Sequence, residues 1–527
     1  MVTPTVTLEA TLGVSINDVA GNAINDITGD PILDMGLADI IADTRTDAPM
    51  IINQGIRGTG ALDRVADIGE ITFRLHNANK QYSPDAVASV RDRFRMGIDV
   101  RLGISSAGNT SYTRGKVGYI EPDSSTFGRV GTEIVANDWM KEAAEVHPGR
   151  MQVQLAKRDD QLLTTLLAAM PLTPLTQSLA TGPETYAYAF HNFKDEDAYA
   201  IGVMQSISQS GLSYMYVQSD ATYGQTFVYE GRDTRENKAN DPPSLTLSDS
   251  MSGVRVFHDE NKRVRKVTIH VVPTRVDPAA TTVLYSIDNE ITLNSGASKT
   301  FVAYYRDPDE EATRVAGLSM VTPVVDTDYK FSSVSGSGND FNADLEVLIG
   351  DAGEFGGNSA VVTVTNNNVA TGYLHFFRLR GKGVYQYDIS SKSVEDTTQT
   401  RGVELDFTLV YNGDLDAAAI FAQLLLDQWK DDQPFLDGVE FVANRSADLM
   451  EAAITGDIGD LVTIKETQTG VSGNFFIQHR NITISQKSEH VLVRWQLIPA
   501  STASLFEAWI LDSATRSQLD STTILGL

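Results

Sequence analysis

Two short runs of cationic side chains have the spacing expected of an interaction surface. These candidate contacts are Arg91, Arg93, Arg95, Lys262, Arg263, Arg265 and Lys266. Cations of this kind can bind nucleic-acid phosphates, but a single-strand binder also interleaves aromatic side chains that stack on the bases. Only Phe94 lies near the first run, and no aromatic residue lies within the second. We therefore interpret both runs as solvated strand faces or as subunit contacts with an acidic partner.

Residues that could perform catalysis or hold a metal do not form a recognisable set. The chain has no cysteine, and its eight histidines include no pair at helical i, i+4 spacing. P-loop, zinc-protease and nucleophile-elbow motifs are missing from the sequence. His258 and His270 lie in or beside a strand-like run, which favours a paired structural histidine over a ligand. We predict no catalytic residue, no cofactor and no metal, although 69 acidic residues leave an accidental carboxylate pair open.

Two acidic or glycine-rich segments could attract calcium. Gly336–Phe341 is similar to one copy of a calcium-binding β-roll repeat, but such rolls stack several copies. A Gly/Asn-rich hairpin turn is the simpler interpretation. Asp307–Glu311 carries the oxygen ligands that calcium prefers, and we interpret it as an exposed acidic loop.

The elements that must position these residues are mostly strands. The chain has 527 residues, of which 42% are hydrophobic and 21% charged, and its formal net charge is −27. This composition is typical of globular proteins, and the excess of acid disfavours a nucleic-acid binder. Apolar residues alternate in Ile71–Leu75, Val264–Val272 and Val491–Leu497, as in half-buried antiparallel strands. We predict a mainly β, multi-domain fold.

Helical patterns are few. Leucines at helical spacing predict a helix from Gln161 to Met170, which Pro171 ends. The spacing of apolar residues predicts a second helix over 416–430, capped by Asp416. Shifts in composition divide the chain into five blocks. They are a strand-rich block at 1–155, a mixed α/β block at 156–275, a β-sandwich at 276–385, a last block at 386–500 with the helix 416–430, and a tail at 501–527.

A set of strand-and-turn motifs runs in order along the chain. The first is Gly69–Pro84, in which an alternating strand leads into an L-x-N turn and then Tyr-Ser-Pro. The others are Gly97–Leu102, Arg114–Ile120, Val135–Met140, Phe227–Arg235, Phe301–Pro308, Met320–Pro323, Leu379–Tyr385, Leu461–Ile464, Phe475–Ile477 and Val493–Pro499. Together they resemble the tail-tip hub, or minor tail, proteins of tailed bacteriophages and related prophages.

This resemblance implies a baseplate-hub-like structural protein with two β-barrel hub domains, at 1–155 and 386–500, and a β-sandwich insertion. It also implies a homotrimer around a channel at the distal end of the virion tail, through which DNA passes without specific binding. The implied partners are the distal tail protein, the tape measure protein and other tail-tip proteins. In this role the chain would adapt the tail tube to the tip and close or gate the channel.

Two other functions stay open at this point. A carbohydrate-binding adhesin would contact the host surface through aromatic residues of the sandwich. The candidates are Tyr304, Tyr305, Phe376 and Phe377, and alternation places one of each neighbouring pair in the core. A cell-wall hydrolase using two carboxylates is the third hypothesis, and no motif supports it.

Overall fold

The computed structural model describes residues 2–12, 14–15, 33–34, 37–91, 93–123, 130–192, 198–350, 355–485, 488–503, 507–508 and 523–524. Six α-helices and many more strands lie in these ranges, so the predicted mainly β fold class is confirmed. The helices are α1 (Trp139–Glu145), α2 (Asp159–Ala169), α3 (Ala200–Gly211), α4 (Arg232–Asn240), α5 (Leu415–Trp429) and α6 (Ala447–Thr455). No helix in the described part of the chain has the length and apolarity to cross a membrane.

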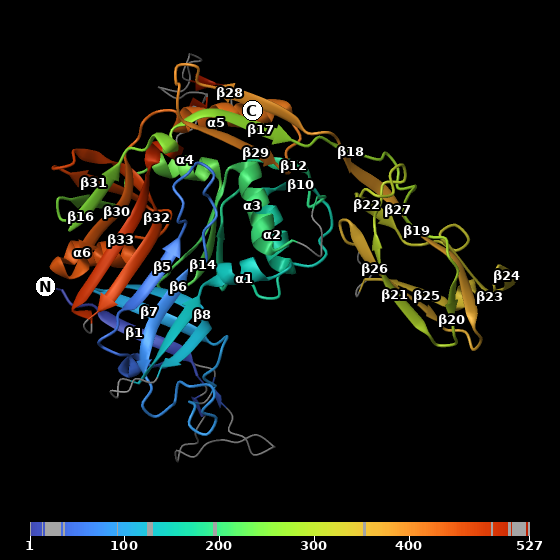
Figure 1. Cartoon of the computed structure of the whole chain (residues 1–527), viewed down its shortest axis with the longest axis horizontal. Helices are drawn as coiled ribbons and strands as arrows, with labels where there is room; N and C mark the ends of the chain where they lie inside the picture. Colours follow the sequence, from blue (N-terminus) through green and yellow to red (C-terminus); the bar gives the residue numbers. More distant parts are fainter. Residues whose placement is uncertain are drawn as a thin grey trace.

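The largest sheet combines strands from both ends of the chain (Figure 1). Its order is β16-β30-β33-β32-β5-β6-β9-β8-β7-β1-β4, and β31 and β15 branch from β32. The strands are β1 (Thr5–Thr11), β4 (Leu37–Asp39), β5 (Met50–Gly55), β6 (Glu70–His76), β7 (Asp99–Ser106), β8 (Asn109–Asp123), β9 (Gly131–Asn137), β15 (Leu245–Ser248), β16 (Gly253–Phe257), β30 (Phe435–Val442), β31 (Leu461–Glu466), β32 (Val471–Ser485) and β33 (His490–Pro499). Antiparallel pairing of β5 with β32 joins the two halves, with Asn53 opposite Asn481.

One continuous core lies against both halves of this sheet. Ile71, Phe73 and Leu75 of β6 are buried, as the alternation predicts, and they share a cluster with Trp495 of β33. Leu449 of α6 belongs to the same cluster, so this helix also packs between the halves. The two ends of the strand order, β16 and β4, are not paired with each other in the described residues. The two barrels therefore stay a prediction.

A helical layer stands beside the sheet, near the middle of Figure 1. Leucines of α2 pack with α1, α3, β13 and β14 in a second core cluster. The strands here are β10 (Gln154–Arg158), β11 (Thr176–Leu179), β12 (Thr185–Ala189), β13 (Tyr214–Gln218) and β14 (Thr226–Glu230). Helix α2 matches the helix predicted over 161–170 to within two residues at its start.

Helix α5 has the predicted length, but its cap differs from expectation. The side chain of Asp414 accepts a hydrogen bond from the backbone N–H of Asp416, so Asp414 is the N-cap and Asp416 lies in the first turn. The helix packs on a separate sheet, and its Trp429 also stacks on Phe435 of β30 in the large sheet. The separate sheet has the order β28 (Ser390–Glu395), β17 (Val264–Val271), β29 (Val403–Leu409).

The β-sandwich projects away from the rest of the molecule (Figure 1, right). It is inserted between β17 and β28, which are antiparallel neighbours, so the chain leaves and returns at adjacent points. Its sheets have seven and three strands around one core cluster. The strands are β18 (Thr274–Val276), β19 (Thr282–Ile287), β20 (Ile291–Leu293), β21 (Ser298–Tyr304), β22 (Ala316–Val321), β23 (Tyr329–Val334), β24 (Ser337–Asp340), β25 (Leu345–Ile349), β26 (Ser359–Asn366) and β27 (Gly372–Gln386).

The predicted blocks are interleaved in space. Strands from 1–155, from 156–275 and from 386–500 share the large sheet, and β28 and β29 of the last block pair with β17 of the mixed block. The block boundaries themselves stay a prediction about domain units. Two short pairs complete the described strands, β2 (Val14–Ser15) with β3 (Leu33–Asp34) and β34 (Glu507–Ala508) with β35 (Thr523–Ile524).

Candidate functional site

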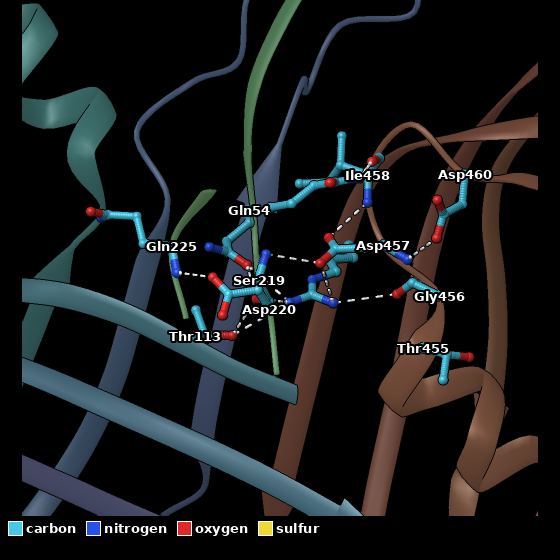
Figure 2. Close-up of polar contacts among 12 residues, drawn as sticks. Gln54, Thr113, Ser219, Asp220, Gln225, Thr455, Gly456, Asp457, Ile458 and Asp460 are labelled. Carbon is cyan, nitrogen blue, oxygen red and sulfur yellow. Dashed lines mark hydrogen bonds and ion pairs between the residues drawn. The ribbon is translucent and has the colours of Figure 1, made fainter. Parts of the chain in front are cut away.

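A buried arginine lies where three parts of the chain meet. Arg480 of β32 is 1% exposed, and its Nη1 lies 3.3 Å from Oδ2 of Asp457, in the turn between α6 and β31. Its Nη2 donates to Oε1 of Gln54 on β5 at 3.1 Å and also contacts Ser219, which follows β13. Figure 2 shows Asp457, Gln54 and Ser219 converging from these separate elements. We call Arg480, Asp457, Gln54 and Ser219 the arginine junction.

The turn 456–460, which contains Asp457, contacts the end of β13 and the residue that follows it. The backbone N–H of Ser219 donates to Oδ2 of Asp457 at 2.9 Å (Figure 2). Nε2 of Gln218 donates to the carbonyl of Ile458 at 2.5 Å. Gly459 has φ +85°, and a Cβ there would lie 2.0 Å from the hydroxyl oxygen of Tyr216. The turn and β13 therefore approach each other as closely as a glycine allows.

An aspartate holds the adjoining loop in shape. The carboxylate of Asp220 accepts backbone N–H bonds from Thr222 at 2.7 Å and from Gln225 at 2.9 Å. Burial alone would raise the pKa of Asp220, but hydrogen bonds from the backbone of Gly224, Thr222 and Tyr223 and from the side chain of Thr226 bring it below its ordinary value. The backbone of Asp220 also exchanges hydrogen bonds with Tyr112 on β8, so the loop is joined to the first half of the large sheet.

Burial dominates the electrostatics of the junction. It raises the pKa of Asp457 from 3.8 to about 6, and the positive charge of Arg480 limits this rise. Burial also raises the pKa of the neighbouring Asp460. A second buried pair lies nearby, where Nε of Arg235 on α4 is 3.1 Å from Oε2 of Glu230 on β14.

The chemistry open to the junction is structural. A raised carboxylate pKa is also a mark of general acids, so the junction is a candidate active site on that ground alone. Arg480 and Asp457 are both buried, however, and the hydrogen-bond partners given above are protein groups. These contacts hold three chain segments against one another. Because the groups are buried, the loss of any contact would lower the free energy of unfolding.

One arginine of the first cationic run contacts the rest of the protein. Nη1 of Arg91 is 3.0 Å from Oδ2 of Asp43 and donates to the hydroxyl of Tyr82 at 2.8 Å, so this side chain anchors the loop after β6. Arg93 and Arg95 are exposed on the same loop, and the buried Phe94 between them packs edge-on against Tyr82. The structure thus separates an anchoring arginine from two surface ones.

The second cationic run lies at the β17 sheet. Arg265 forms ion pairs with Glu395 on β28 and Glu404 on β29. Lys266 lies opposite the same two glutamates in the strand register, and Nε of Arg263 donates to the carbonyl of Lys430 at 3.3 Å. Lys262 ends a short 3-10 helix and is half-buried. The role of the two runs as subunit contacts stays a prediction.

The aromatic residues proposed for glycan binding are only partly available. Tyr305 and Phe377 are core residues of the sandwich, as alternation predicts. The guanidinium of Arg314 lies 4.4 Å from the ring centre of Tyr304, and that of Arg378 lies 5.0 Å from the ring centre of Phe376. Each half-buried ring thus has one face covered by an arginine, which disfavours stacking of a sugar on that face.

The remaining candidate ligands for metals are two histidines, a glycine-rich hairpin and an acidic loop. His258 lies 3.0 Å from Asp432, and Nε2 of His270 lies 2.7 Å from Asp406, so both histidines are paired. Ser337–Asp340 forms a hairpin with β23, and Asp309 and Glu310 are exposed. In the part of the chain that the structure describes, no group of three or more histidine, aspartate or glutamate side chains is arranged to hold a metal ion.

Sequence reasoning missed every residue of the arginine junction. Arg480 lies in a strand whose alternation shows only that it shares a face with buried neighbours. The Gly456–Asp460 segment, Gly-Asp-Ile-Gly-Asp, has the residues of a tight turn and is the one local signal that was available.

Comparisons with known proteins give structural neighbours only. No family model and no curated protein matches the sequence. A tail protein from Neisseria meningitidis is 11% identical and has a TM-score of 0.47, with 95% of this chain and 99% of that chain covered. The 43 kDa tail protein of prophage MuSo2 from Shewanella oneidensis is 10% identical over 95% and 99%, with a TM-score of 0.45. A component of the type VI secretion system from E. coli is 7% identical over 87% and 75%, with a TM-score of 0.38.

Two of these structures are of tail proteins, the class that the ordered sequence motifs resemble.

Proposed function

We propose that the chain is a structural, non-enzymatic protein of a phage tail that forms the hub at its distal tip. One observation carries the proposal. Seven of the eleven motifs that resemble tail-tip hub proteins lie on β6, β7, β8, β9, β31, β32 and β33, and all of these strands belong to one sheet, while the other four lie on β14, β21, β22 and β27. Motifs separated by more than 300 residues thus build one body, as a hub that surrounds a channel requires.

In this role the chain joins the tail tube to the tip and closes or gates the DNA channel. Each chain carries a net charge of −27, and if part of this charge faces the channel of a homotrimer, the channel lining is acidic. DNA leaving the particle would meet repulsion instead of adhesion. Opening would be a rearrangement of packed elements and not bond chemistry.

The proposed partners follow from the same arrangement. The body would contact the distal tail protein and the tape measure protein, and the projecting sandwich would reach other tail-tip proteins or the host surface (Figure 1). Arg93, Arg95 and Lys262 are at least partly exposed cations on an acidic chain, which suits contacts between subunits.

Electron microscopy of particles labelled with antibody to this chain tests the location. We expect label at the distal end of the tail, and analytical ultracentrifugation of the purified chain should show a trimer. A stable monomer that does not sediment with virions would contradict the proposal.

A further inference from the structure

Three arginine side chains line a very small cavity between α4 and α5. The cavity measures about 10 Å³, and its cationic lining residues are Arg64, Arg232 and Arg235. Leu212, Tyr214, Leu424, Gln428 and Thr502 complete the lining. Such a concentration of positive charge is unexpected inside a chain of net charge −27.

The direct ion pairs around the cavity do not balance this charge. Glu230 is buried and is shared by two cations, Arg235 and Lys238. Glu184 pairs with Arg232. Arg64 forms no ion pair with a described carboxylate, and its Nε and Nη1 donate to the carbonyls of Ala61 at 2.9 Å and of Leu212 at 2.7 Å. Asp460 attracts Arg235 at longer range without pairing with it.

Arg235 has donors with no acceptor. Its side chain is 1% exposed, and neither Nη1 nor Nη2 has a hydrogen-bond partner among the described residues. Its guanidinium carbon lies 4.2 Å from the ring centre of Tyr214, and that of Arg64 lies 4.7 Å from the same centre. Ring contacts of this kind stabilise the cations but do not accept their N–H groups in the plane of the guanidinium.

The arginines also affect one another. Burial lowers the pKa of Arg64, and the positive charges of Arg235 and Arg232 lower it further. Burial also lowers the pKa of Arg235, but the carboxylate of Glu230, with smaller contributions from Tyr216, Tyr214 and Asp460, raises it above its ordinary value, so this side chain stays charged. What the site lacks is a hydrogen-bond acceptor for the two terminal amino groups of Arg235.

We propose that this cavity binds a single small inorganic anion of the halide class, such as chloride, held by Arg235, Arg64 and Arg232. Its volume is close to that of one water-sized sphere, which leaves room for a monatomic anion and none for sulfate or phosphate. A water molecule would fit but would bring no charge. The anion would join α4, which carries Arg232 and Arg235, to the segment between β5 and β6, which carries Arg64, and the inference does not depend on the proposed tail function.

Thermal unfolding of the full chain in different sodium salts at equal ionic strength tests the site. We expect chloride and bromide to raise the midpoint by about 1–3 °C over gluconate, with saturation as the halide concentration rises. Sulfate should give no saturable gain of this kind. In crystals grown with bromide, we expect an anomalous-scattering peak in the cavity.

A substitution assigns the effect to the cavity. Arg64→Met keeps the apolar stem and removes one cation, so the difference between chloride and gluconate should fall at least threefold. Arg255→Met is the matched control, because the side chain of Arg255 is 75% exposed and its charge is solvated. If Arg64→Met does not fold, the bromide experiment on the unchanged chain decides. Equal midpoints in all salts, or a cavity with no anomalous peak, would mean that it holds only water and would overturn the proposal.

Discussion

Gln54 and Arg480 are 426 residues apart in the chain, yet Nη2 of Arg480 donates to Oε1 of Gln54 at 3.1 Å. The bond crosses the line along which β5 pairs with β32, where the two halves of the large sheet meet. On its other side, the same guanidinium forms the ion pair with Asp457. One buried side chain thus joins the first strands, the last strands and the turn after α6.

We expect Arg480→Met to lower the free energy of unfolding by ~3–5 kcal/mol, because it leaves Asp457 and Gln54 buried without their partner. Chemical denaturation followed by tryptophan fluorescence measures the change. Arg494→Met on the neighbouring strand is the control. Arg494 is half exposed and 3.9 Å from Asp437, so its loss should cost about 0–1 kcal/mol. Equal effects of the two substitutions would show that the buried junction stabilises the fold no more than an exposed ion pair does.

The pH dependence of stability should reveal Asp457. Burial raises its pKa to about 6 in the folded chain, against an ordinary value of 3.8. The folded state therefore binds this proton more tightly, and the group's contribution is fully present below pH 3.8 and lost as the pH rises through 6. We expect the stability difference between the unchanged chain and Asp457→Asn to grow in favour of the unchanged chain between pH 6.5 and 4.5. Parallel stability curves over this interval would rule out the raised pKa.

The close approach at Gly459 predicts a large effect from a single methyl group. Gly459→Ala would place Cβ 2.0 Å from the hydroxyl oxygen of Tyr216 at φ +85°, so both overlap and backbone strain oppose it. Gly470→Ala is a matched control, because φ is +75° and no atom lies within 4 Å of the added Cβ. The control should lose about 1 kcal/mol and Gly459→Ala roughly 1–3 kcal/mol more. Adding Tyr216→Phe to Gly459→Ala should recover part of that excess, and no recovery would place the strain elsewhere.

The local sequence pattern was sufficient to predict strands and strongly apolar helices. The alternation of Ile71, Phe73 and Leu75 and the leucines of α2 predicted both the elements and the buried faces. Helix α3 was missed because glycine and serine interrupt its apolar face, and α6 because it has only nine residues. For such elements, packing against the rest of the chain decides the structure.

The arginine junction and the single large sheet could not have been found in this way. Alternation shows which face of a strand is buried, but it does not say which strand lies beside it. The pairing of Asn53 with Asn481 joins residues more than 400 positions apart, and nothing local encodes that register.

The cap of α5 shows how a boundary error arises and how it can be tested. Asp414 and Asp416 are both suitable N-cap residues, and only the backbone geometry distinguishes them. We expect Asp414→Ala to lower the free energy of unfolding by about 1 kcal/mol, because a backbone N–H loses its acceptor. Asp416→Ala should cost less, since it removes only a favourable charge in the first turn. A larger loss for Asp416→Ala would restore the sequence-based assignment.

Salt dependence tests the exposed cations as subunit contacts. If Arg95 faces an acidic surface of a second chain, Arg95→Glu should weaken the oligomer about tenfold or more at 50 mM NaCl, because an attraction becomes a repulsion. At 500 mM NaCl the two proteins should differ much less, since screening shortens the range of both interactions. Arg401→Glu is the control, because Arg401 is exposed and only loosely paired with Glu260 at 3.8 Å. Sedimentation equilibrium at both salt concentrations measures the constants. An oligomer that is indifferent to Arg95→Glu and to salt would place the subunit contact on another surface.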